Sequence, residues 1–150
     1  LGAGDWPDLA TYPLFSRRIL TACSPELKEE IGFSSFDDLD GQTLIVHENR
    51  PHSWVNWAKA MDISPPRAGK IFRFDSMSAV VQAAAQGLGV AIVSWPLSES
   101  WFKSGALVRA FEEEVDTRED FYLAHRPEEH ERQEVRDLIA WMIDRFQVDA

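Results

Sequence analysis

The stretch that decides the fold is FRFDSMSAVVQAAAQGLGVAIVSW, residues 72–95. It opens on the end of an alternating strand, continues through an Ala-rich segment with helical spacing, and closes on a short apolar run typical of a buried strand. A strand, a helix and a strand in this order favour parallel strands in an α/β layer architecture. Asp75 and Ser76 stand where the helix begins, and Gly87 and Gly89 stand where it gives way to the next strand.

The two glycines do not form a dinucleotide-binding fingerprint. That motif lies between a strand and the helix that follows it, whereas Gly87 and Gly89 come after the helix. Gly87 is a candidate for the C-cap, and Gly89 allows the backbone to pass close to a neighbouring strand. The glycines therefore predict a tight structural junction.

The alternation of strands and helices extends along the whole chain. Ser24 and Pro25 indicate a helix start, and Gly32 indicates its end. We expect strands at residues 14–23, 43–48, 69–75, 89–95, 106–111 and 120–126, and helical segments at 24–32, 34–42, 53–62, 76–87, 95–105 and 127–146. The last helix carries an apolar stripe made of Val135, Leu138, Ile139, Met142 and Phe146. This pattern predicts an α/β fold with a mainly parallel sheet.

The composition limits the function. A chain of 150 residues with 45% hydrophobic residues builds one compact domain or two small lobes. The net charge of −10 disfavours tight nucleic-acid binding by this chain, and its acidic runs are typical of solvated faces. No apolar run is long enough for a membrane span, so we expect no membrane partner. One cysteine, Cys23, excludes an internal disulfide framework and permits a cytoplasmic location.

The order of these segments resembles the effector-binding domain of LysR-type transcriptional regulators. The resemblance rests on the polar helix start, the Ala-rich helix and GLGVAIV in the opening stretch, followed by GALV and a phenylalanine. Upstream, LFSRRILTACSPEL, FDDLDGQTLIVHE and SWVNWAKAM match in the family's order, and FYLAHRPEEHERQEVRDLIAWM resembles its last strand and closing helix. GDWPDL and the W-x-x-W helix resemble the glycine-cleavage-activator branch.

The resemblance implies a type II periplasmic-binding-protein-like fold with two α/β lobes, of which the first is incomplete here. Residues 1–16 would be a remnant of lobe one, residues 17–118 the complete lobe two, and residues 119–150 the returning part of lobe one. The crossovers near residues 17–21 and 120–123 would form a hinge. The chain, which begins at Leu1, is expected to be a fragment without the family's DNA-binding part.

The resemblance also implies a function and its partners. The chain would sense a small effector, with an anion as one alternative, in a cleft between the lobes and take part in homo-oligomerisation, as a dimer or tetramer. It would act on DNA only through a winged helix-turn-helix absent from this chain. Carried over by position, the ligand-binding residues would be His47, Glu48, Trp54, Ser76 and Tyr122. The resemblance implies no cofactor and no enzymatic activity.

Other interpretations remain open at the level of sequence. Ser76 is either a helix cap alone or a cap that also contacts the ligand. His47, Glu48 and His52 are compatible with a metal site, but their spacing across a turn fixes no convergence and we predict none. An extracytoplasmic solute-binding protein or an enzyme on the same fold are the functional alternatives, although the sequence has no G-x-S-x-G nucleophile elbow.

Overall fold

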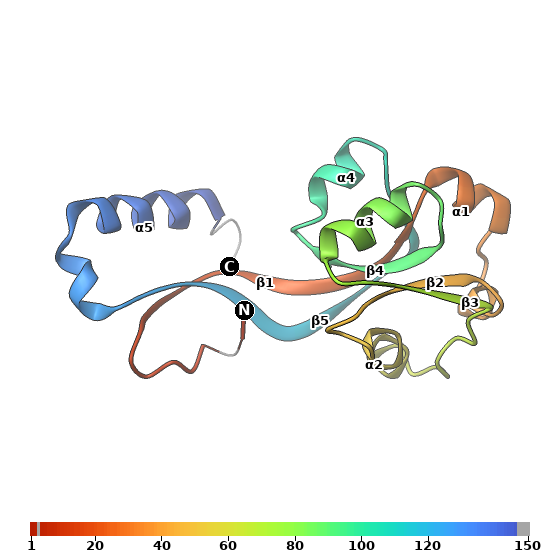
Figure 1. The fold of residues 1–150 in the computed structure, drawn as a ribbon, viewed down its shortest axis with the longest axis horizontal. Helices are drawn as coiled ribbons and strands as arrows, with labels where there is room; N and C mark the ends of the chain where they lie inside the picture. The colour runs from red at the N-terminus through yellow and green to blue at the C-terminus, as the bar shows by residue number, and fades with distance from the viewer. Residues whose placement is uncertain (3, 147–150) are drawn as a thin grey trace. The chain divides into compact units, whose positions relative to one another are not determined.

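The computed structural model describes residues 1–2 and 4–146 (Figure 1). A five-stranded sheet runs in the order β3-β2-β4-β1-β5. Its strands are β1 (Ala10–Cys23), β2 (Thr43–His47), β3 (Lys70–Phe74), β4 (Val90–Trp95) and β5 (Val108–His125). The helical segments are α1 (Pro25–Ile31), η1 (Phe36–Leu39), α2 (Ser53–Ala60), α3 (Met77–Ala85), α4 (Glu99–Lys103), η2 (Pro127–Glu131) and α5 (Gln133–Phe146). The predicted α/β alternation is present.

The sheet is mixed. β2 pairs in parallel with both β3 and β4, so the two strands of the opening stretch run in the same direction but lie on either side of β2 and do not pair with each other. β1 pairs antiparallel with β4, so the expectation of a mainly parallel sheet holds for β2, β3 and β4 but not for β1. β1 reaches β2 through α1 and η1, so a helical connection did not by itself impose a parallel direction on β1.

Three of the predicted elements differ from the structure. The separate strands expected at 106–111 and 120–126 form one strand, β5, which runs through the acidic segment between them. The long helix expected at 127–146 is broken into η2 and α5 at Arg132, whose backbone is extended. Within α5 only Ile139 of the predicted apolar stripe is fully buried, and Leu138 is half exposed.

The chain divides into two compact units. Unit 1 comprises Leu1–Arg17 and Asp116–Ala150, and unit 2 comprises Arg18–Val115. β1 and β5 each contribute residues to both units, so the chain passes between them twice. The assignment of these units to the lobes of a larger domain stays a prediction.

Unit 2 has a core on each face of its sheet. α2 packs on one face, around the fully buried Trp57, with Ile19, Val46 and Ile92 from the strands. α3 packs on the other face, against Leu20, Ile45, Ala91 and Val93. α3 and α4 lie together on one side of the sheet and α2 on the other (Figure 1). This layering directs the N-termini of α2 and α3 towards one edge of the sheet, the edge at which β2 and β3 end.

The opening glycines have separate structural roles. Gly87 has φ of 77°, a conformation that L side chains rarely adopt, and its N–H donates to the Ala84 carbonyl as α3 ends. Gly89 has no positive φ. A Cβ there would lie 2.4 Å from the Thr43 carbonyl oxygen, because β4 starts directly against β2. The prediction of a close backbone approach at Gly89 is confirmed.

Unit 1 is held by aromatic and polar contacts between its strands. Phe15 of β1 packs against Phe121 of β5, with ring centroids 4.7 Å apart. Arg17 donates to the Glu119 carboxylate at 3.0 Å, and the Thr117 hydroxyl donates to the Arg17 carbonyl at 2.8 Å. These contacts tie the two strands of unit 1 together.

Candidate functional site

The carboxyl ends of β2 and β3 meet at one edge of unit 2. His47 lies opposite Phe74 in the parallel register, and the Glu48 N–H donates to the Phe74 carbonyl at 2.8 Å. Ser76 follows two residues after Phe74 and opens α3. The fold therefore brings the backbones of His47, Glu48 and Ser76 to the same edge, where parallel α/β sheets commonly bind ligands.

Ser76 caps α3. Its backbone is extended, with φ of −131° and ψ of 146°, and its Oγ accepts a hydrogen bond from the Ala79 N–H at 3.2 Å. The capping role predicted for this serine is confirmed. Because a hydroxyl accepts and donates at the same time, the capped Ser76 retains a proton that can be donated outward. The adjoining turn of α3 adds unpaired N–H groups and the positive end of the helix dipole.

His47 is held in one tautomer. Its Nδ1 accepts a hydrogen bond from the Asn49 N–H at 3.1 Å, so this nitrogen carries no proton. The neutral ring then bears its proton on Nε2, which makes Nε2 a donor. The neighbouring Glu48 side chain is exposed and supplies a carboxylate acceptor. The edge therefore offers both donors and a negative charge.

Trp54 belongs to the core of unit 2. It is 6% exposed, and its Nε1 donates to the Ile45 carbonyl at 3.2 Å. Its ring meets Trp57 edge to face, with centroids 5.7 Å apart. These contacts give Trp54 a packing role that fixes the start of α2, and its contact with a ligand stays a prediction.

Tyr122 lies in unit 1. Its hydroxyl is 3.4 Å from the Asp120 carboxylate, and its ring packs edge to face on Trp6. Desolvation and the negative charge of Asp120 raise the pKa of Tyr122 above its usual value. Gly4 approaches the same ring, since a Cβ there would lie 2.9 Å from the Tyr122 hydroxyl oxygen. The predicted contribution of Tyr122 to a ligand site stays a prediction.

The sequence reasoning missed a charged cluster at the end of β4. Arg18 of β1 lies opposite Trp95, the last residue of β4, in the antiparallel register. The Glu114 carboxylate forms ion pairs with both Arg18 and Arg109. No local motif marks these residues, because β1 and β5 bring them together from distant parts of the chain.

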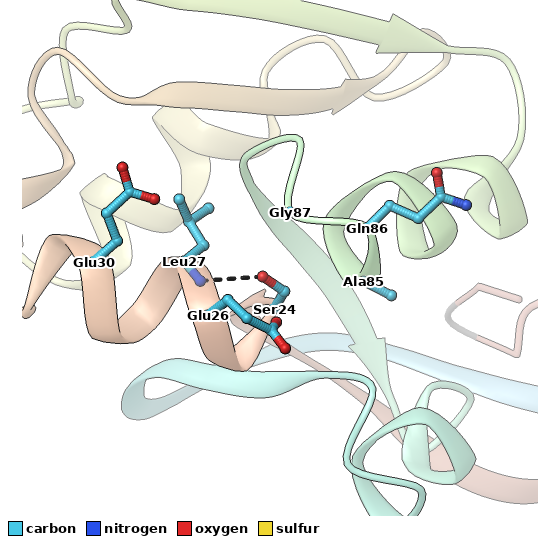
Figure 2. A pocket seen from close by; sticks show the side chains of 7 residues that line it. All are labelled: Ser24, Glu26, Leu27, Glu30, Ala85, Gln86 and Gly87. Carbon is cyan, nitrogen blue, oxygen red and sulfur yellow. Dashed lines mark hydrogen bonds between the residues drawn. The ribbon is translucent and has the colours of Figure 1, made fainter.

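A shallow pocket lies at the opposite edge of unit 2, between α1 and the end of α3 (Figure 2). It encloses about 250 Å³ and is lined by Ser24, Glu26, Leu27, Glu30, Ala85, Gln86 and Gly87. Ser24, whose Oγ accepts a hydrogen bond from the Leu27 N–H at 3.2 Å, is occupied as the cap of α1. None of the predicted site residues lines this pocket.

The structure places no three candidate metal ligands together. Within residues 1–2 and 4–146, no group of three His, Cys, Asp or Glu side chains is arranged to hold a metal ion. The Cys23 thiol is fully buried, and burial raises its pKa to about 11, which disfavours the reactive thiolate. None of the helices in the described part of the chain has the length and apolar character of a bilayer span.

The sequence matches the LysR substrate binding domain over residues 1–147. The chain belongs to this family. The effector domain of the transcriptional regulator AmpR from Pseudomonas aeruginosa is 26% identical and superposes with a TM-score of 0.78, covering 95% of this chain and 68% of that one. The AmpR effector binding domain from Citrobacter freundii, 23% identical, shares the fold with a TM-score of 0.81 over 97% of this chain and 72% of that one. The predicted family and fold class are confirmed.

Relatives with similar sequences support the same family assignment. The glycine cleavage system transcriptional activator of Escherichia coli is 28% identical over 145 residues, which are 95% of this chain and 47% of that protein. The HTH-type transcriptional regulator y4mQ of Sinorhizobium fredii is 34% identical over 118 residues, which are 79% of this chain and 38% of that protein. The chain thus spans less than half the length of these two relatives.

Proposed function

We propose that this chain is the effector-sensing and oligomerisation part of a LysR-type transcriptional regulator. The observation that carries the proposal is the match to the LysR substrate binding domain over residues 1–147. The relatives named above are transcriptional regulators, which favours this function over the transport protein considered from sequence. In the whole protein, DNA would be bound by a separate winged helix-turn-helix, in the cytoplasm and as a dimer or tetramer.

The effector would bind at the edge of unit 2 where β2 and β3 end. Ser76 and the N-terminus of α3 supply donors for an anionic group, and the Nε2–H of His47 supplies another. Glu48 supplies an acceptor for an N–H or hydroxyl group of the ligand. Trp54 would hold the start of α2 in place, and a ligand contact by Tyr122 stays a prediction carried over from the family resemblance.

The effector acts by shifting populations. A ligand changes the balance between two conformations only by its difference in affinity for them, and a tenfold difference corresponds to about 1.4 kcal/mol. The conformation that binds the effector better would alter how subunits pack and so reposition the DNA-binding domains. The proposal assigns no catalytic residue.

Substitutions at Ser76, combined with a ligand screen, test the proposal. A panel of small carboxylates, phosphates and amino acids is screened for a rise in the melting temperature of the chain, since a ligand at about 100 times its Kd stabilises the folded state by about 2.7 kcal/mol. Ser76→Asp keeps the cap, so its melting temperature without ligand should match that of the wild type. The added negative charge should weaken binding of an anionic hit by more than about tenfold, measured by calorimetric titration.

Ser76→Ala completes the test. It should lower stability by about 1 kcal/mol through the lost cap and should also weaken binding. An anionic hit that binds the normally folded Ser76→Asp variant with unchanged affinity would reduce Ser76 to a cap. A hit that binds this chain but leaves transcription by the longer regulator unchanged would contradict the sensing role.

A further inference from the structure

Arg18 lies at the same edge of unit 2 as the proposed effector site. It is opposite Trp95 in register, and Trp95 ends β4 beside the end of β2. Neighbouring strands are about 4.8 Å apart, so two strand spacings, about 10 Å, separate β1 from β2 at this edge. The alternation of β1 places Arg18 on the face of Leu20, the face that α3 covers. Arg18 therefore shares both edge and face with the start of α3.

Arg18 and Arg109 differ in how firmly they are held. Arg109 pairs with Glu114, donates to the Glu112 carbonyl at 3.1 Å and stacks over the Trp95 ring at 5.8 Å. Arg18 donates through one terminal nitrogen to the other oxygen of Glu114, at 2.6 Å, and this is its one side-chain hydrogen bond among the described residues. The Arg18 side chain is 46% exposed, whereas that of Arg109 is 27% exposed.

The cluster of Arg18, Arg109 and Glu114 has a net positive charge. Two arginines and one carboxylate sum to +1, and most of the donors of Arg18 are not used by Glu114. A guanidinium presents its N–H groups as a planar fork that matches a carboxylate or a phosphate. Glu114 occupies only one corner of that fork, so a second anion can bind Arg18 beside it or in its place.

We infer that Arg18 is a specificity-determining residue that binds the anionic group of the effector, a carboxylate or a phosphate, with Glu114 holding the guanidinium in position until the ligand arrives. This inference deepens the proposed function and rests on it for the identity of the ligand as an effector. It assigns the ligand a negative charge at the β1 side of the edge, in addition to the group received at the start of α3.

The test uses simple anions as probes. Inorganic phosphate and acetate are titrated separately into the chain at constant ionic strength, and the Nε–H signals of the arginines are followed by NMR. We expect saturable shifts at Arg18 with at least one of the two anions, and the better anion distinguishes a phosphate-bearing from a carboxylate-bearing ligand. Arg18→Gln should weaken this binding by at least about tenfold.

Glu114→Gln gives the opposite change and keeps the test informative if Arg18→Gln folds poorly. Removing the competing negative charge should tighten anion binding about threefold. Arg67 provides a matched control, because it is also an exposed arginine paired with a carboxylate, Asp40, but it precedes β3 at the opposite edge of the sheet. Arg67→Gln and Asp40→Asn should leave anion binding at Arg18 unchanged.

Two results would overturn the inference. One is shifts that grow without saturation and equally at Arg18 and Arg67, which would show only screening by the added salt. The other is affinity that Glu114→Gln fails to raise. Either result leaves the proposed function standing, provided that an effector still controls transcription by the longer regulator. Anion binding at Arg18 without any such control would instead contradict the proposed function alone.

Discussion

Replacing Thr21 with valine should stabilise the protein. Thr21 lies in β1 opposite Ile92 and is 0% exposed. Its Oγ1 is buried and has no hydrogen-bond partner among the residues that the structure describes. The alternation of β1 directs this side chain to the face of Ile19 and Cys23, which is the apolar core beneath α2. The hydroxyl therefore gave up its hydrogen bonds to water on folding and gained none in the core.

The expected gain follows from the cost of that hydroxyl. A buried polar group without a partner costs about 1–3 kcal/mol. Valine has nearly the same shape, is also branched at Cβ and is equally favoured in strands, so Thr21→Val removes the cost without opening a cavity. We expect a gain of about 1 kcal/mol, which raises the melting temperature by about 2–4 °C in a chain of this size.

The assay is calorimetric melting of the wild type and of two threonine variants. Thr117→Val is the matched control, because the Thr117 hydroxyl donates to the Arg17 carbonyl at 2.8 Å. The same chemical change should there lower stability by about 1 kcal/mol. A melting temperature that falls in Thr21→Val as it does in Thr117→Val would refute the reasoning, since it would mean that both hydroxyls are satisfied in the folded protein.

Gly89→Ala should destabilise the fold by about 3 kcal/mol or more, because its Cβ would lie 2.4 Å from the Thr43 carbonyl oxygen. In the control variant Gly32→Ala the new Cβ meets no neighbouring atom, so the substitution should cost only about 1–2 kcal/mol for its positive φ. Equal losses of stability in urea unfolding would contradict this difference. The pKa of Cys23 is raised to about 11 from 9.0, so the stability gained by keeping this thiol neutral is complete below about pH 9 and is lost as the pH rises towards 11. The difference in unfolding free energy between the wild type and Cys23→Ala should therefore shrink between about pH 8 and about pH 11, and a constant difference would oppose the assignment. Trp54→Phe should cost about 1–3 kcal/mol, since it removes the buried hydrogen bond from the Trp54 indole N–H to the Ile45 carbonyl, and an unchanged urea midpoint would show that this hydrogen bond contributes nothing.

Features set by nearby residues were predictable from sequence. Ser24 before a proline and Gly32 after an apolar position define α1, and the structure shows the serine cap and a left-handed glycine with φ of 65°. Ser76 was predictable as the cap of α3 for the same reason. Such features depend on one or two hydrogen bonds within four residues, so the amino-acid types suffice to locate them.

Features set by distant partners were not predictable in the same way. The acidic stretch inside β5 has the composition of a solvated loop, yet strand pairing and ion pairs from Arg18 and Arg109 to Glu114 hold it extended. The break before α5 was also missed, although its partner lies only five and six residues further along the chain. The Arg136 guanidinium donates to the carbonyls of His130 and Glu131, which a continuous helix would have paired internally.

The residues of the candidate site also differ in whether sequence alone could place them. His47, Glu48 and Ser76 could be placed at one edge from the strand–helix order alone, because the ends of parallel strands meet there. The burial of Trp54 could not be read from its spacing with Trp57, which suits a core and a binding face equally. Arg18 was missed because its position depends on the antiparallel register with β4.

The most direct measurement of the central claim is a map of backbone amide shifts in the chain on binding the best hit of the ligand screen. The account predicts the largest changes at His47, Ser76 and Arg18, the edge where β2, β3 and β4 end. The pocket between α1 and the end of α3, with Glu26 and Glu30, should remain unchanged. Changes centred on that pocket, with none at Ser76, would contradict the account.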